Sequence, residues 1–299
     1  MQSQKTIIMK NENAFNWDIK QTGILDINGN PIKGYKEITR DDNGSSIAVM
    51  KESYTPMTTQ QFSDTANEVA GAIGGSGLIF KDWNDNSVEG QMGANKPVIT
   101  CQMEMSEPLE IAGSKIEGKL TIGVGFDGGR SFFIGHTNTY LRCTNEFSSI
   151  VKDFKSRLTV NNMVRVEDII KNIQTYRDYE RNLYENFERF HNTKIDEKIV
   201  QECLARLVDL TVEERAMTVK ERNTELSSQK LNKIDDITAS IRTEMAELGN
   251  NAWGLFNGVT HYSTHIMNSR GSNELSTMFG AKNKANQIVY GLGLELLDA

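Results

Sequence analysis

The sequence predicts an α+β protein, with an antiparallel sheet in the N-terminal half packed against a mainly helical C-terminal half. Up to residue 143, short runs of β-branched and apolar residues alternate with polar ones, which is typical of half-buried strands. From residue 144 onward, apolar residues recur every three or four positions, which is typical of amphipathic helices. With 299 residues, 38% of them hydrophobic, the chain can bury one large core or two modest ones. We expect an irregular segment over residues 1–34, a β-rich region over 35–144, and a helical region over 145–299 that forms one compact unit with the sheet.

The β-rich region is predicted to begin after a loop. Turn residues at 28–31 (Asn-Gly-Asn-Pro) favour a loop over a strand or helix. Residues 35–39 and 46–51 have strand composition, and the Asp-Asp-Asn-Gly run at 41–44 between them indicates a hairpin. The antiparallel meander is expected to continue through four more strands, over residues 77–80, 97–105, 115–126 and 130–143.

One helix is predicted inside the β-rich region, over residues 58–73. Thr58 and Gln61 match a capping box, and apolar residues then follow at helical spacing as far as Gly74. Several long helices are predicted beyond residue 144, and we find no internal repeats. Their apolar stripes over 166–190 and 231–248 offer more surface than one modest sheet needs, so we expect a homo-oligomer; the alternative is that the stripes pack on each other within one chain.

Composition and charge argue against several classes of protein. No apolar run is long enough to span a bilayer and the N-terminus lacks the layout of a signal peptide, so we expect a cytoplasmic protein. Cys101, Cys143 and Cys203 lie far apart, which argues against a disulfide framework or a thiolate metal site. The net charge of −7 argues against coating of duplex DNA, but residues 111–171 carry nine basic and six acidic side chains, which leaves room for a local basic site.

Two motifs have the spacing of ligand sites. Residues 123–128 match G-x-G-x-x-G, but strand-like sequence follows them, so a hairpin turning at Gly128-Gly129 fits better than a dinucleotide site. His261 and His265 share one helical face, as a zinc site requires, but the pattern lacks a third ligand and favours polar packing. No catalytic motif is found, so we expect neither enzymatic activity nor a metal or cofactor.

The hairpin around Gly128-Gly129 carries the most informative pattern. If Asp127 pairs with Arg130, one face of the two strands is apolar and the other mixes basic with aromatic residues. Such a face suits single-stranded nucleic acid, because bases stack on rings while cationic groups follow the phosphates. It equally fits a sheet covered by helices, in which the rings form a second core layer. The residues predicted to bind nucleic acid, on this face and on the adjacent helix, are Lys115, Lys119, Arg130, Phe132, His136, Tyr140, Arg142, Lys152, Lys155 and Arg157.

Three stretches taken together resemble a known family. They are residues 40–44 with 54–56, residues 126–131 with 142–145, and residues 251–262 (NAWGLFNGVTHY). They are similar to the phage/plasmid-like protein family of unknown function, over most of the chain from about residue 35. The sequence departs from that pattern at residues 16–18 and at His261. The resemblance implies a mobile-element origin and brings no catalytic residues. Strands in a meander followed by a long helix from Asn145 are also similar to the core of Rad52-like single-strand annealing proteins.

We therefore expect a non-enzymatic protein of phage or mobile-element DNA metabolism that binds single-stranded DNA or RNA in recombination, annealing or replication. The alternative is a protein-binding factor that inhibits or evades a host defence system. An acidic chain suits that role too, because opposite charge speeds encounter with a basic partner.

Overall fold

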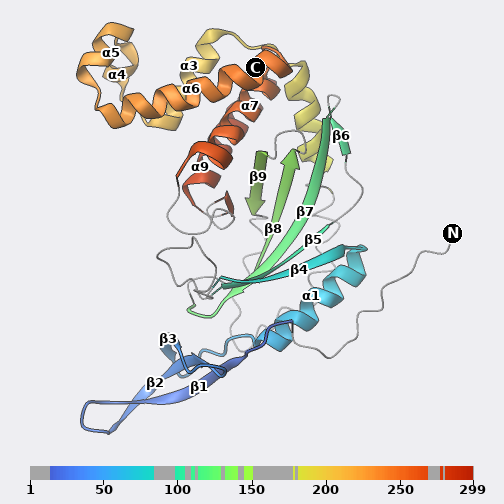
Figure 1. Ribbon diagram of the computed structural model, residues 1–299, viewed down its shortest axis with the longest axis vertical. Coiled ribbons are helices and arrows are strands. Elements are labelled where there is room, and N and C mark those ends of the chain that lie inside the picture. The colour runs from blue at the N-terminus through green and yellow to red at the C-terminus, as the bar shows by residue number, and fades with distance from the viewer. Residues whose placement is uncertain are drawn as a thin grey trace, which may run out of the picture. The chain divides into compact units, whose positions relative to one another are not determined.

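A computed structural model of the chain confirms the α+β architecture, with antiparallel strands towards the N-terminus and a mainly helical C-terminal half (Figure 1). It divides into two compact units, where one unit was expected. The first comprises residues 1–106, 118–136 and 150–176, and the second comprises residues 107–117, 137–149 and 177–299. The structure describes residues 14–83, 98–104, 109–111, 114–128, 132–140, 145–150, 178, 181–268, 277–278 and 280–298.

The first unit contains a three-stranded antiparallel sheet in the order β1-β2-β3. Its strands are β1 (Ile19–Leu25), β2 (Pro31–Arg40) and β3 (Ser46–Lys51). The prediction of an irregular segment up to residue 34 is therefore wrong from residue 19 onward. The loop signal at residues 28–31 is correct, because this loop joins β1 to β2, and Gly29 has a φ of +82° there. The hairpin predicted around residues 41–44 is confirmed between β2 and β3.

Helix α1 (Thr59–Ile73) follows the capping signals of its sequence. The Thr58 hydroxyl accepts the N–H of Gln61, and the Gln61 side chain accepts the N–H of Thr58. Gly74 ends the helix with a φ of +73°, in the left-handed region that glycine adopts at least cost. The buried face of α1 includes Phe62 and Val69, which the apolar spacing places on one side of the helix.

A second sheet follows, with strand order β4-β5-β7-β8-β9 and β6 paired to β7. The meander thus forms two sheets, and the described ladders β4–β5, β5–β7 and β6–β7 are antiparallel. Residues 145–150 form strand β9, so the prediction that the helical region begins at residue 145 is wrong. The strands are β4 (Ser76–Asp82), β5 (Val98–Glu104), β6 (Leu109–Ile111), β7 (Ser114–Gly125), β8 (Phe133–Tyr140) and β9 (Asn145–Ile150).

The core of the first unit joins α1 to the inner face of β5 and β7. A polar cluster holds the base of β2 beside this core. The Arg40 guanidinium lies 4.2 Å from the centroid of the Trp17 ring. Trp17 Nε1 and Arg40 each donate a hydrogen bond of 2.8 Å to Asp82, and Arg40 also pairs with Asp42. These contacts fix the small sheet at its base.

The second unit is mostly helical. Phe187 and Phe190, on a helix over residues 181–192, pack with Trp253 and Phe256 in one aromatic core. Among the described residues, no helix has both the length and the apolar character that crossing a bilayer requires. The other helices are α3 (Glu197–Val208), α4 (Val212–Ala216), α5 (Val219–Glu225), α6 (Ser228–Leu248), α7 (Ala252–His261), the π-helix η2 (Tyr262–Ile266) and α9 (Ala281–Leu297).

The stripes that suggested self-association pack inside the second unit wherever they are described. Ile241 is fully buried on α6, and Leu231, Ile234, Met245 and Leu248 pack against the same core. This is the alternative named above, and the described part of these stripes leaves no free apolar seam. Self-association stays a prediction without support from this feature.

Candidate nucleic-acid interface

The structure confirms that Leu120, Ile122 and Val124 of β7 face the core, but it reverses the face predicted for Phe132, just before β8. Phe132 is fully buried, with its ring centroid 6.5 Å from that of Phe62 on α1. Ile134 joins the same cluster, whereas Phe133 packs over Gly123 on the other face of the sheet. The expectation that Phe132 offers an open ring for base stacking is therefore wrong. The predicted turn at Gly128-Gly129 lies partly outside the described residues, and a shift of one residue is enough to exchange the two faces of a strand.

Two of the predicted lysines are described, and both face acidic residues across the ladder. Lys115 lies opposite Glu110 of β6, and Lys119 lies opposite Glu104 of β5. Opposite charges at such positions stabilise a sheet modestly, which is a structural role. The side chains of the other predicted residues lie outside the described part of the chain: Arg130, His136, Tyr140, Arg142, Lys152, Lys155 and Arg157.

The two histidines lie close together, with ring centroids 4.9 Å apart. His261 Nδ1 lies 3.1 Å from Glu244 Oε1, and the Glu244 side chain is only 8% exposed. Within the described ranges, no group of three or more histidine, cysteine or acidic side chains could hold a metal ion. The contact with Glu244 favours polar packing of His261.

A face that combines basic and aromatic residues lies instead on the small sheet. In the ladder Tyr35 lies opposite Lys51, Glu37 lies opposite both Val49 and Thr22, and Thr39 lies opposite Lys20. Alternation along the strands brings these side chains to one face, which we call the arm face. Tyr35 is 48% exposed and Val49 is 58% exposed, and both lysines are exposed. The arm face comprises Lys20, Thr22, Tyr35, Glu37, Val49 and Lys51; Thr39, at the base of the same face, is buried.

The opposite face of the small sheet is occupied where it approaches the core. Ile38 is fully buried there, and Arg40 is held by the two carboxylates described above. The sheet therefore has one anchored side and one open side. An antiparallel sheet of this kind can present a binding surface without exposing its core.

The hairpin between β1 and β2 ends in an apolar tip. Leu25 is 60% exposed, Ile32 is 42% exposed and Ile27 is fully exposed. The loop is nevertheless well ordered by its own hydrogen bonds, because Asp26 Oδ1 accepts the N–H groups of Asn28 and Asn30 at 2.8 Å. The bonds from Asn30 and Asn28 lower the pKa of Asp26.

The strands of the small sheet and its tip carry more cations than carboxylates. Lys20, Lys33, Lys36 and Lys51 lie there with Asp26 and Glu37, once Arg40 and its partners are set aside, whereas Asp41 and Glu52 follow directly after β2 and β3. Among the described residues, no carboxylate lies within ion-pair distance of these lysines. Lys36 donates to the carbonyl of Glu52 at 2.8 Å. The small sheet with its tip, which we call the arm, therefore offers cations, one exposed ring and an apolar end together.

Sequence reasoning missed this surface because residues 1–34 were assigned no strand. The signal was present: an Asn-Gly pair at 28–29 stands between apolar residues, with Ile27 before it and Ile32 after it. Such a pair between strand-like segments is a strong hairpin signal.

The described residues thus define an α+β protein whose small sheet exposes lysines and a tyrosine on one face, and no group of three or more metal-ligating side chains occurs among them. The chain belongs to the DUF932 family, a domain of unknown function, which matches residues 47–286. The match begins in β3, so β1 and β2 precede it. No curated protein and no solved structure matches the chain.

Proposed function

We propose that the protein binds single-stranded nucleic acid through the arm face, as a non-enzymatic component of phage or mobile-element DNA metabolism. The observation that carries the proposal is the exposed ring of Tyr35 beside the exposed Lys51 on an open sheet. Bases stack on such rings whatever their sequence, and lysines neutralise the adjacent phosphates.

The apolar tip supports the same proposal. Apolar side chains at the end of a β-ribbon can wedge between neighbouring bases, and Leu25, Ile27 and Ile32 lie exposed there. Because a single strand is already partly unstacked, we expect it to bind more tightly than a duplex. Recombination, annealing and replication all expose such strands, and a Rad52-like role remains one of these proposals.

The test is fluorescence anisotropy of the full chain with a labelled single-stranded oligonucleotide at low salt, beside the matching duplex. Stacking contributes roughly 1–3 kcal/mol per base, so Tyr35→Ala is expected to weaken binding by roughly five-fold to 150-fold. Tyr35→Phe is the matched control, because it keeps the ring and should bind like the unaltered protein.

The lysines are tested by the salt dependence of the affinity. Lys20→Gln and Lys51→Gln should each lower the slope against the logarithm of salt concentration by about 0.7, the value for one phosphate contact with a single strand. Lys220→Gln, an exposed lysine of α5, is the control and should leave the slope unchanged. No binding to the single strand, or equal binding by Tyr35→Ala and Tyr35→Phe, would refute the proposal.

A protein partner is the second candidate, and the exposed tip favours it too. Exposed apolar clusters on a charged surface mark protein contacts, and the net charge of −7 suits a basic host protein. The test is recovery of one partner from host lysate after nuclease treatment, by the unaltered protein and by Ile27→Asp. Loss of the partner with Ile27→Asp, together with no oligonucleotide binding, would favour this candidate.

A further inference from the structure

A short repeat builds the helical pair α4 and α5 of the second unit. Residues 211–215 read Thr-Val-Glu-Glu-Arg, and residues 218–222 read Thr-Val-Lys-Glu-Arg. Each threonine caps its helix in a capping box with the glutamate three residues later. No side chain of either helix is buried, so these local caps hold the helices without a core. The repeat places an arginine at the same point of each helix, Arg215 and Arg222.

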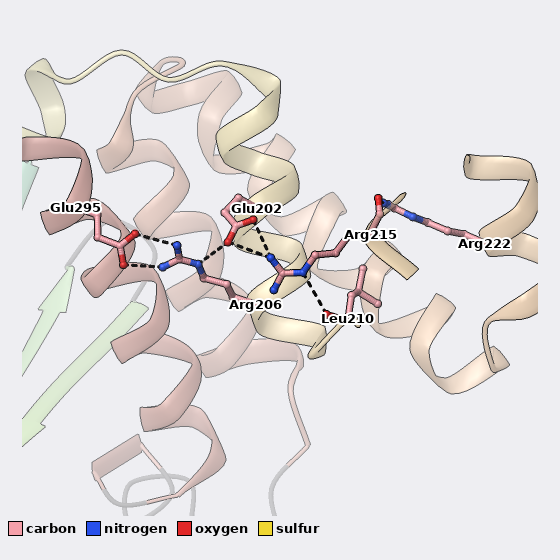
Figure 2. Close-up of polar contacts among 6 residues, drawn as sticks. All are labelled: Glu202, Arg206, Leu210, Arg215, Arg222 and Glu295. Carbon is pink, nitrogen blue, oxygen red and sulfur yellow. Dashed lines mark hydrogen bonds and ion pairs between the residues drawn. The ribbon is translucent and has the colours of Figure 1, made fainter. Parts of the chain in front are cut away.

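The two arginines turn towards α3 and line one pocket with it (Figure 2). The pocket has a volume of about 320 Å³, near the lower end of the range of small-molecule sites. Its walls are Glu197, Lys198, Gln201, Glu202 and Ala205 of α3, with Arg215 and Arg222.

Most of the charge at the pocket is already paired. Glu202 lies 2.7 Å from Arg206 and 3.1 Å from Arg215, and Arg206 also donates to both oxygens of Glu295. Hydrogen bonding by Arg206, together with the nearby Arg215, lowers the pKa of Glu202, so this carboxylate stays ionised. Glu197 pairs with Arg242 at 3.0 Å.

Arg222 and Lys198 differ from these pairs. The Arg222 guanidinium donates to the carbonyls of Glu214 and Arg215, at 3.2 and 2.8 Å, and approaches the Gln201 amide oxygen at 3.5 Å. These acceptors orient the group but carry no full negative charge. In the described part of the chain, no carboxylate lies within ion-pair distance of Arg222 or Lys198.

The pocket and its ion-pair partners therefore carry a surplus of two positive charges. Five cations stand against three carboxylates, Glu197, Glu202 and Glu295. Of the glutamates of the repeat, Glu214 pairs with Lys230, whereas Glu213 and Glu221 keep their charge but do not line the pocket. A chain with a net charge of −7 thus concentrates positive charge in one pocket.

We propose that this pocket binds a small phosphate-bearing molecule, with Arg222 and Lys198 as the cations that contact the phosphate and Arg215 beside them. A phosphate monoester is a dianion near neutral pH, which matches the surplus of two charges. The planar guanidinium of Arg222 is suited to paired hydrogen bonds with phosphate oxygens. The pocket is larger than a bare phosphate requires, so it leaves room for a small organic group over Ala205.

The experiment is isothermal titration of the full chain with adenosine 5′-monophosphate, inorganic phosphate and adenosine. We expect saturable binding of the monophosphate and little binding of adenosine. Inorganic phosphate separates the two sources of the phosphate group: binding as tight as that of the monophosphate assigns the site to the free ion, and weaker binding assigns it to an ester.

Two variants locate the site. Arg222→Gln and Lys198→Gln should each weaken binding about tenfold or more, because each removes a charge-assisted contact. Lys220→Gln makes the same change of charge on α5 outside the pocket and should have no effect. Since Lys198 lies on α3, its variant reports on the site even if Arg222→Gln disturbs α4 and α5.

The proposal is overturned if neither phosphate compound binds saturably, or if Lys220→Gln weakens binding as much as Arg222→Gln. It is independent of nucleic-acid binding by the arm, because the pocket lies in the other compact unit. Tyr35→Ala should leave the affinity for adenosine 5′-monophosphate unchanged.

Discussion

Gly258 of α7 is the position where one added methyl group should cost most. A Cβ atom there would lie 2.4 Å from the Cα of Ile241 on α6 and 3.0 Å from its backbone nitrogen. Carbon atoms pack at about 3.5–4.0 Å, so the two helices would have to separate by about 1 Å. Backbone atoms cannot rotate out of the way as a side chain can. We expect Gly258→Ala to lower the free energy of unfolding by about 2 kcal/mol. Overpacking costs about 3 kcal/mol, and the higher helix propensity of alanine offsets about 1 kcal/mol of this.

The matched control is Gly291→Ala on α9 in the same unit. A Cβ atom at Gly291 meets nothing within 4 Å, so only the gain in helix propensity remains. Differential scanning calorimetry of the full chain compares the two variants. Gly258→Ala should lower the melting temperature of its transition by about 4–8 °C, and Gly291→Ala should raise it by about 1–4 °C. An increase for both variants would show that α6 and α7 do not approach as described.

Three further outcomes are expected. Asp82→Ala should lower the free energy of unfolding by about 1–3 kcal/mol in urea denaturation, because the buried Arg40 keeps only one carboxylate partner; Asp82→Asn, which keeps an acceptor oxygen, should cost less. The pKa of Glu202 is lowered in the folded chain, so its contribution to the free energy of unfolding is complete above the ordinary value of 4.5 and is lost as the pH falls below it. The protection of the α4 and α5 amides, taken as their exchange relative to the intrinsic rate at each pH, should fall there, and unchanged protection would contradict the ion-pair network. Burial raises the pKa of Cys101 and of Cys203 to about 12, so a thiol reagent at pH about 8 should label both only after unfolding, as peptide mass spectrometry would show.

Local signals were the most dependable part of the sequence. Thr58 and Gln61 predicted the start of α1, and Gly74 its end, because capping depends on residues three or four positions apart. The loop at residues 28–31 was recognised for the same reason, although the strands on either side were partly missed. The capping boxes of α4 and α5 are equally local signals, and the repeat that they form shows that the prediction of no internal repeats is wrong for residues 211–222.

Register and strand assignment were the least dependable. The hairpin pattern predicts Phe132 on the open face, but its ring is buried in the core, and a shift of one residue exchanges the two faces of a strand. The apolar spacing after residue 144 predicts a helix that includes Phe147, yet Phe147 lies in β9 and packs against Phe187 and Phe256. A short apolar run satisfies either period, and long-range packing decides between them.

The sequence by itself determined the α+β class, helix α1 with both its ends, and the membership of a family of unknown function, because each depends on neighbouring residues or on the pattern of the whole chain. Only the tertiary structure decided that Tyr35 and Lys51 share an open sheet face, and that Arg222 and Lys198 meet at one pocket. Those pairs form through ladder register and through packing between helices, and neither is encoded in the spacing of adjacent residues.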